Sequence, residues 1–193
     1  MSGRGAIEVA DLEGIFRECF FEEHRTVLVG GGEEPVYLPS PDPGRLPHRI
    51  VYREDYLASA LHEVAHWCLA GQRRRRLEDY GYWYVPDGRN ADEQRAFERV
   101  EAAPQALEWI FSDACRVPFH LSVDNLEGDA GPSPDFQALV EEQRRRFLGK
   151  GLPPRAAAYR YALQEWAERN GERPDQESAG ASGGEDSRAG ESG

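Results

Sequence analysis

Apolar residues recur at helical spacing near the start of the chain. Between Ala6 and Phe21, five apolar side chains fall on one face of a helix: Ile7, Leu12, Ile15, Phe16 and Phe20. The pattern then changes to three short apolar runs at residues 26–29, 36–38 and 49–52. Glycines 30–32 and a proline-rich stretch separate these runs, as is typical of strands between breakers. The first third of the chain therefore predicts one helix followed by a small, roughly three-stranded sheet.

The remaining apolar pattern is helical. Residues 55–70 predict a strong helix that is apolar almost all round, with Gly71 placed to end it. A second long helix is predicted over residues 92–114, with an interruption or bend at Pro104. Two more helical stretches follow, at residues 135–148 and 154–169. We expect an α/β fold in which a small mixed sheet packs with several helices in one domain.

The length and the ends of the chain set the domain limits. A chain of 193 residues suits one domain with a substantial core. We expect a flexible start at residues 1–5 and a folded domain at residues 6–171. Residues 172–193 are rich in Gly, Ser and acidic side chains and hold no large apolar residue. Such a composition cannot offset the entropy lost on ordering, so this tail is predicted to be disordered.

Composition narrows the classes of function. The formal net charge is -12, and six acidic and two basic residues in the tail leave about -8 on the domain. That charge argues against direct DNA binding and favours a cationic substrate or a basic partner. The three cysteines, Cys19, Cys68 and Cys115, form neither a disulfide framework nor a metal knuckle, so buried thiols are expected. The sequence offers no long apolar run or leader peptide, and we therefore expect a cytoplasmic protein without a membrane anchor.

The predicted helix at residues 55–70 carries an HExxH motif. His62 and His66 are four residues apart, so both imidazoles lie on one face and can bind the same metal ion. Glu63 follows the first histidine and is placed to handle a proton, which makes it the candidate catalytic residue. Two histidines on an apolar face can also be structural, but a buried pair without an ion is hard to satisfy.

Two histidines leave the ion short of ligands, and the usual third ligand is a carboxylate from another helix. Helical spacing places Glu101 closer than Glu98 to the apolar face of the helix at residues 92–114. We therefore expect Glu101 to be the third metal ligand, with Glu98 or Glu108 as a supporting partner or a replacement. Zinc-activated hydrolysis and Fe(II)-dependent oxygen chemistry both use such a ligand set, and spacing alone does not separate them. Because HExxH with a downstream glutamate is commonest in zinc peptidases, the motif by itself ranks a zinc peptidase first. A purely structural metal in a binding module is a third alternative.

Several strings around this motif resemble the bacterial elongation factor P hydroxylase family. The resemblance covers roughly residues 16–161 and includes EPVYLP, HRIVY, YLASALHEVAHWCLAG and FHLSVDNLEGD. It implies an enzyme of the monooxygenase type that hydroxylates the β-lysylated lysine of elongation factor P. It also implies a compact fold similar to that of metal-dependent ribonucleases of rRNA maturation. On this basis the metal is expected to be Fe(II), with zinc as the alternative, and dioxygen the co-substrate.

The family resemblance gives further residues a candidate role. The aromatic residues Tyr82 and Tyr84 could line a channel for a long cationic side chain, although a half-buried strand explains them equally well. Asp124 and Glu127 lie in an acidic loop that could bind the β-lysyl amines or simply form a turn. The arginines at residues 73–76 follow a helix end, where solvated cations are favoured, and could also contact the partner protein. No dinucleotide-binding glycine pattern is present, so the electrons are expected to come from outside the chain.

Overall fold

The computed structural model describes residues 5–80, 91–122 and 132–170. Within these ranges the chain forms a three-stranded sheet, one short 3₁₀ helix and five α-helices. Their bounds are α1 Val9–His24, β1 Thr26–Gly32, β2 Val36–Leu38, β3 His48–Arg53, α2 Leu57–Leu69, η1 Arg74–Arg76, α3 Ala91–Cys115, α4 Pro134–Lys150 and α5 Pro154–Asn170. The α/β class, the small mixed sheet and the number of predicted helices are confirmed.

The sheet is mixed, with strand order β1-β3-β2. Strand β1 runs parallel to β3, and β2 runs antiparallel to it on the other side. Ile50, at the centre of β3, pairs with Leu28 on one side and with Tyr37 on the other. Both Leu28 and Ile50 are buried because the sheet presents that face to the helices.

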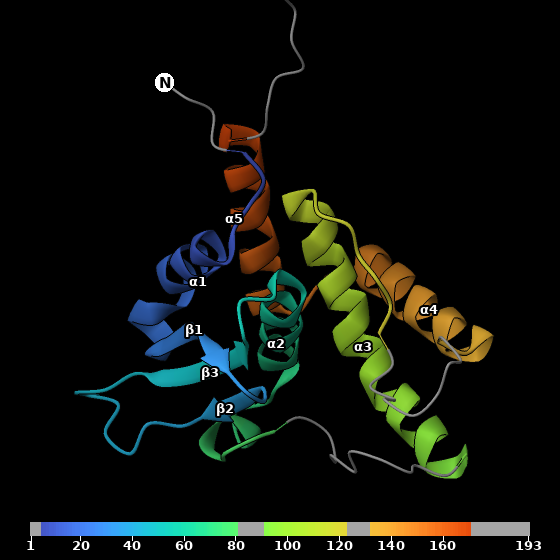
Figure 1. Cartoon of the computed structure of the whole chain (residues 1–193), viewed down its shortest axis with the longest axis horizontal. Helices are drawn as coiled ribbons and strands as arrows, with labels where there is room; N and C mark the ends of the chain where they lie inside the picture. Colours follow the sequence, from blue (N-terminus) through green and yellow to red (C-terminus); the bar gives the residue numbers. More distant parts are fainter. Residues whose placement is uncertain (1–4, 81–90, 123–131, 171–193) are drawn as a thin grey trace, which may run out of the picture.

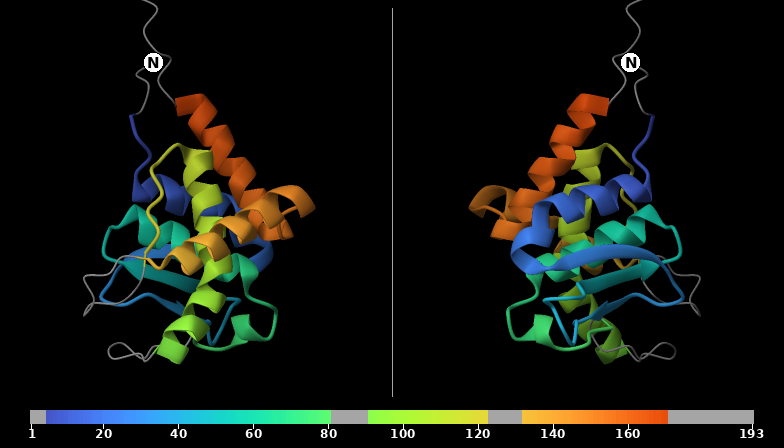
Figure 2. Two further views of the ribbon diagram at one scale, coloured as in Figure 1. Left: turned by 90° about the vertical axis from the view of Figure 1, so that its right-hand side faces the viewer. Right: turned by 90° about the vertical axis from the view of Figure 1, so that its left-hand side faces the viewer.

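The elements stack in the order sheet, α2, α3 and α4 (Figure 1). Helix α2 is central: it contacts β1 and β3 of the sheet as well as α1, α3 and α5. The two side views agree, since one has α4 in front and the other has α1 and the sheet in front (Figure 2). A helix surrounded on several sides must be apolar nearly all round, and six residues of α2 are accordingly buried: Ala60, Leu61, Val64, Ala65, Trp67 and Cys68.

The predicted boundaries need three corrections. Helix α1 begins at Val9 rather than Ala6, because the Glu8 N–H donates to the Asp11 carboxylate at 3.0 Å and starts the helix there. Glycines 30–32 do not separate two strands but belong to β1, where the pairing register with β3 shifts between Val29 and Gly32. Gly71 does not end α2, since the chain already leaves the helix in an extended conformation at Ala70.

The long helix α3 continues through Pro104, so of the expected interruption or bend the interruption does not occur. Proline removes one backbone donor, yet the buried faces on both sides of it hold the helix in place. Its length matters for function because Glu98, Glu101 and Glu108 all lie on this one helix, which packs against α2. None of the described helices combines the length and the apolar composition that crossing a membrane requires. The predicted tail at residues 172–193 lies outside the described residues.

Candidate metal centre

The two histidines of α2 meet across one helical turn. The Nε2 atoms of His62 and His66 lie 3.0 Å apart, and their ring centroids are separated by 4.6 Å. Both side chains are partly exposed, whereas Leu61, Val64 and Ala65 beside them are fully enclosed. The tight packing of α2 therefore fixes the backbone that presents the two imidazoles.

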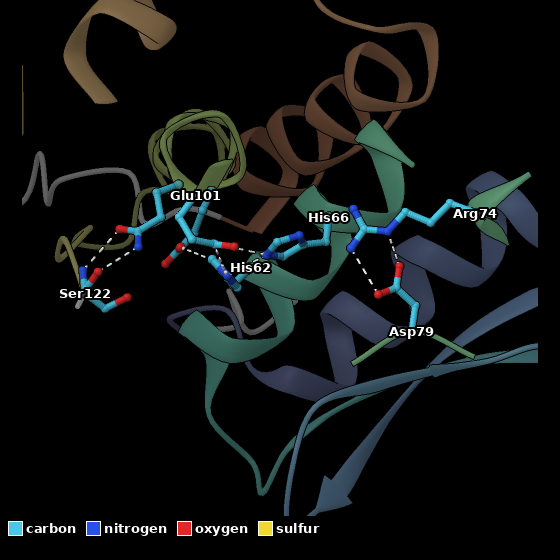
Figure 3. A network of polar contacts seen from close by, with 8 residues as sticks. His62, His66, Arg74, Asp79, Glu101 and Ser122 are labelled. Atoms are coloured by element: carbon cyan, nitrogen blue, oxygen red, sulfur yellow. Dashed lines mark hydrogen bonds and ion pairs between the residues drawn. The ribbon is translucent and has the colours of Figure 1, made fainter. Parts of the chain in front are cut away.

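Glu101 reaches the same point from α3. Its Oε2 atom lies 3.4 Å from the Nε2 of His62 and 3.3 Å from the Nε2 of His66. Figure 3 shows the two imidazoles of α2 turned toward this carboxylate. These three residues form a possible metal-binding site, with one ligand atom from each within 4.8 Å of the others.

The spacing of the three ligand atoms suits a first-row metal ion. Ligand bonds of about 2.0–2.2 Å at tetrahedral or octahedral angles place neighbouring ligand atoms about 2.8–3.6 Å apart. The three separations of 3.0, 3.3 and 3.4 Å all fall within that interval. Among the described residues, the cluster offers two imidazoles and one carboxylate. Such a set leaves coordination positions open and fits a reactive metal better than a closed structural one.

Glu108 supports the first histidine from behind. Its Oε2 atom lies 2.8 Å from the Nδ1 of His62, and the glutamate is 4% exposed. An ionised carboxylate can only accept at this position, so Nδ1 carries a hydrogen and Nε2 is the nitrogen that a metal ion can bind. Of the two supporting glutamates expected from the sequence, Glu108 thus contacts a histidine of the cluster.

Electrostatics couple these groups. Burial alone would lower the pKa of His62, but hydrogen bonds to Glu101 and Glu108 outweigh it and raise the pKa well above its ordinary value. Burial would likewise raise the pKa of Glu101, but the charge of His66 and hydrogen bonds from both histidines lower it. Without a metal ion, His62 therefore keeps its proton to a higher pH than an ordinary histidine, and Glu101 stays ionised to a lower pH than an ordinary glutamate. A divalent cation would replace that proton.

Glu98 lies elsewhere on the same helix. It is 7% exposed, and its Oε1 atom accepts hydrogen bonds from Gln94 at 3.2 Å and from Ser133 at 3.3 Å. It is not part of the ligand cluster. The structure therefore distinguishes the two glutamates that the sequence left open, and Glu101 is the one beside both histidines.

A small pocket opens beside His66. It amounts to ≈ 20 Å³, enough for about one water molecule, and it lies between α2, the sheet and the segment after η1. Glu63 and His66 line it, together with Tyr37, Ile50, Trp67, Ala70, Arg74, Arg75 and Asp79. Glu63 and His66 are one turn apart on α2, which places the candidate catalytic carboxylate in the same space as a candidate ligand.

Arginines 74 and 75 are less solvated than the sequence indicated. Arg74 forms an ion pair with Asp79, with Nη2 3.0 Å from Oδ1, as Figure 3 shows. Arg75 stacks on Trp67 at 5.7 Å from the ring centroid. These contacts shape the wall of the pocket. Arg73 and Arg76 are exposed, as expected for cations after a helix end.

Sequence pattern alone did not identify one residue near the site, and four candidate residues lie outside the described ranges. Gln105, one turn after Glu101 on α3, exchanges two hydrogen bonds with the backbone of Ser122, at 2.7 and 3.2 Å, and so fixes the chain at Ser122. Figure 3 shows Ser122 in the same view as His62, His66 and Glu101. The only sequence signal for Gln105 was a polar residue on the buried face of a helix. The suggested substrate-binding residues Tyr82, Tyr84, Asp124 and Glu127 lie outside the described residues.

Comparison with known proteins gives a consistent result. Residues 15–177 match the family model described as elongation factor P hydroxylase. The chain is also similar to a protein of Haemophilus influenzae named elongation factor P lysine hydroxylase. The two are 48% identical over 157 residues, which cover 81% of this chain and 87% of the relative. The matched region includes every residue of the cluster, and this chain belongs to the elongation factor P hydroxylase family.

Proposed function

We propose that this protein is a metal-dependent hydroxylase that acts on the β-lysylated lysine of elongation factor P in the cytoplasm. The observation that carries the proposal is the coincidence of two facts. The chain belongs to a family described by this activity, and its central helix brings two histidines and a glutamate of another helix to one point.

Fe(II) is the proposed metal, and the overall reaction needs dioxygen, two electrons and two protons. One oxygen atom of dioxygen enters a C–H bond of the substrate to give C–OH, and the other leaves as water after taking up two electrons and two protons. When bound, Fe(II) in a set of two histidines and one carboxylate supplies the activation of dioxygen for this insertion. The chain shows no dinucleotide-binding motif, so we propose that an external reductant provides the electrons.

The protein's own residues organise this chemistry. Glu108 holds the Nδ1 hydrogen of His62 and so aims its Nε2 lone pair at the site. Glu101 adds a negative charge that favours a cation. Glu63 faces the pocket beside His66 and is placed to pass protons between that space and the site.

The charge of the protein suits the proposed substrate more than a nucleic acid. A net charge of -12 opposes binding to DNA and favours a lysine-derived side chain with its ammonium groups. Elongation factor P would be the protein partner, bound so that this side chain reaches the cluster of His62, His66 and Glu101.

The test is to incubate β-lysylated elongation factor P with the protein, a reductant and air, with either Fe(II) or Zn(II) added. The proposal expects the substrate mass to rise by about 16 Da with Fe(II) and not with Zn(II). No mass gain, together with Zn(II)-dependent cleavage of a peptide or an RNA, would instead establish the hydrolase that an HExxH motif also allows.

A further inference from the structure

Glu98 is a buried carboxylate that the metal cluster does not use. It lies on α3, three residues before Glu101, and only 7% of its surface is exposed. Its Oε1 atom accepts from the amide of Gln94 and from the hydroxyl of Ser133. Within the described part of the chain, its Oε2 atom has no hydrogen-bond partner and the carboxylate forms no ion pair.

The surroundings compensate this charge only in part. Both donors are neutral, and a buried carboxylate is costly unless a cation also neutralises it. The N-terminus of α4 begins beside Ser133 and contributes a favourable dipole, but such an effect is weak compared with the cost of removing an ion from water. The side chain keeps 7% of its surface exposed, so the carboxylate is not completely enclosed.

Glu98 lies on the same helix face as Glu101, one of the proposed metal ligands. Residues three apart on a helix lie on the same face, about 5–6 Å apart at their Cβ atoms. A lysine carries its ammonium at the end of a four-carbon stem about 5 Å long. An ammonium held by Glu98 would therefore leave the carbons of its own stem beside Glu101, His62 and His66.

The formal charge of the site requires a cationic ligand as well. Three glutamates lie at the site, Glu63 beside His66 and Glu101 and Glu108 in contact with His62, and Glu98 lies three residues from Glu101 on α3. A divalent ion neutralises two of these charges. The remaining excess is negative, so it attracts a protonated amine, gives no such attraction to a neutral side chain and repels an acidic one.

We propose that Glu98 is a substrate-binding residue that receives an ammonium group of the lysine-derived side chain through Oε2, and that it thereby sets a C–H bond of that side chain beside the metal ligands. This assignment rests on the proposed function and adds the residue that selects a charged amine.

The test compares two forms of the substrate with the charge as the only intended difference. The amines of β-lysylated elongation factor P are blocked either by reductive methylation, which keeps their charge, or by acetylation, which removes it. Wild-type enzyme should prefer the methylated form in kcat/KM by about ten- to hundredfold, the range of a hydrogen bond to a charged group. Glu98→Gln should reduce this preference to about threefold or less, mainly through a higher KM for the methylated form.

Two further variants make the result specific. Glu98→Asp keeps the charge on a shorter side chain and should keep most of the preference, which a role in helix packing alone would not explain. Glu141→Gln removes an exposed carboxylate from α4 and should behave as wild type. Metal affinity should be the same in all four proteins, because Glu98 is not a ligand.

The outcomes separate the two proposals. If Glu98→Gln keeps the full preference, or loses activity equally on both substrate forms, Glu98 does not bind the ammonium and this inference is overturned. If wild-type enzyme adds oxygen to neither methylated, acetylated nor unmodified substrate, the proposed function itself fails and this assignment fails with it.

Discussion

Replacing Glu108 tests whether the contact behind His62 tunes the metal site. The Oε2 atom of Glu108 lies 2.8 Å from the Nδ1 of His62 in a place that is 4% exposed. Glu108→Gln keeps the shape and an acceptor oxygen but removes the charge. Loss of such a supporting contact typically weakens metal binding by about 10–100-fold, which corresponds to about 1.4–2.7 kcal/mol.

We expect Glu108→Gln and Glu108→Ala to weaken metal binding by different amounts within the range of about 10–100-fold. The neutral amide of Glu108→Gln can still accept from Nδ1, so we expect the dissociation constant for Fe(II) to rise about tenfold. Glu108→Ala also leaves the imidazole free to turn, and its dissociation constant should rise nearer to a hundredfold. Neither variant removes one of the three proposed ligands, so both should still bind one equivalent of the ion.

Metal affinity is measured anaerobically by competition with a chelating dye, and Zn(II) serves as a second ion. Glu141→Gln, an exposed carboxylate on α4, is the matched control and should bind both ions as wild type does. Thermal unfolding of the chelated proteins shows whether a variant is simply less stable. Unchanged affinity in both Glu108 variants would refute the argument that this hydrogen bond orients His62 for metal binding.

Three further predictions follow from contacts elsewhere. First, the stability of the metal-free protein should depend on pH. Because folding raises the pKa of His62 above its ordinary value of 6.5, protonated His62 stabilises the fold fully below pH 6.5, and this stabilisation is lost as the pH rises through the raised pKa. The lowered pKa of Glu101 stabilises the fold above 4.5 and loses this contribution on acidification. Urea unfolding of the chelated protein should therefore give the highest free energy of unfolding between pH 4.5 and pH 6.5. Fe(II) affinity should rise with pH, because the metal ion displaces the proton of His62. Second, Arg155→Ala removes three hydrogen bonds of 2.6–3.0 Å to carbonyl oxygens at the end of α2; the free energy of unfolding should fall by about 2 kcal/mol, with partial recovery in Arg155→Lys. Third, Gly30→Ala places a Cβ 2.7 Å from the Tyr52 hydroxyl and should cost about 1–3 kcal/mol in the same unfolding assay, whereas little change would mean that the strand shifts to make room.

Local pattern was sufficient for much of this site. His62 and His66 share a face because of helical geometry alone, so their meeting could be predicted from a spacing of four residues. The same geometry favoured Glu101 over Glu98, and the structure places Glu101 beside both histidines. The role of each as a metal ligand stays a prediction until an ion is measured.

Contacts between distant segments could not be predicted in this way. Arg155 bonds to carbonyl oxygens more than eighty residues earlier in the chain, and periodicity carries no record of which helix ends meet. The strand order β1-β3-β2 has the same cause, because apolar alternation identifies strands but not their neighbours. Glycines 30–32 were predicted to lie between strands because glycine usually interrupts a strand. The sequence did not show that pairing with the parallel strand β3 keeps them in β1.

The most direct test of the central claim traces the oxygen atom. Wild-type protein loaded with Fe(II) is incubated with β-lysylated elongation factor P and a reductant under ¹⁸O₂, beside His66→Ala. We expect the substrate to gain about 18 Da under ¹⁸O₂ and about 16 Da under ordinary oxygen in H₂¹⁸O, and the His66 variant to lose both metal and activity. No gain from metal-loaded wild-type protein, oxygen derived from water, or a fully active His66→Ala would contradict a hydroxylase centred on His62, His66 and Glu101.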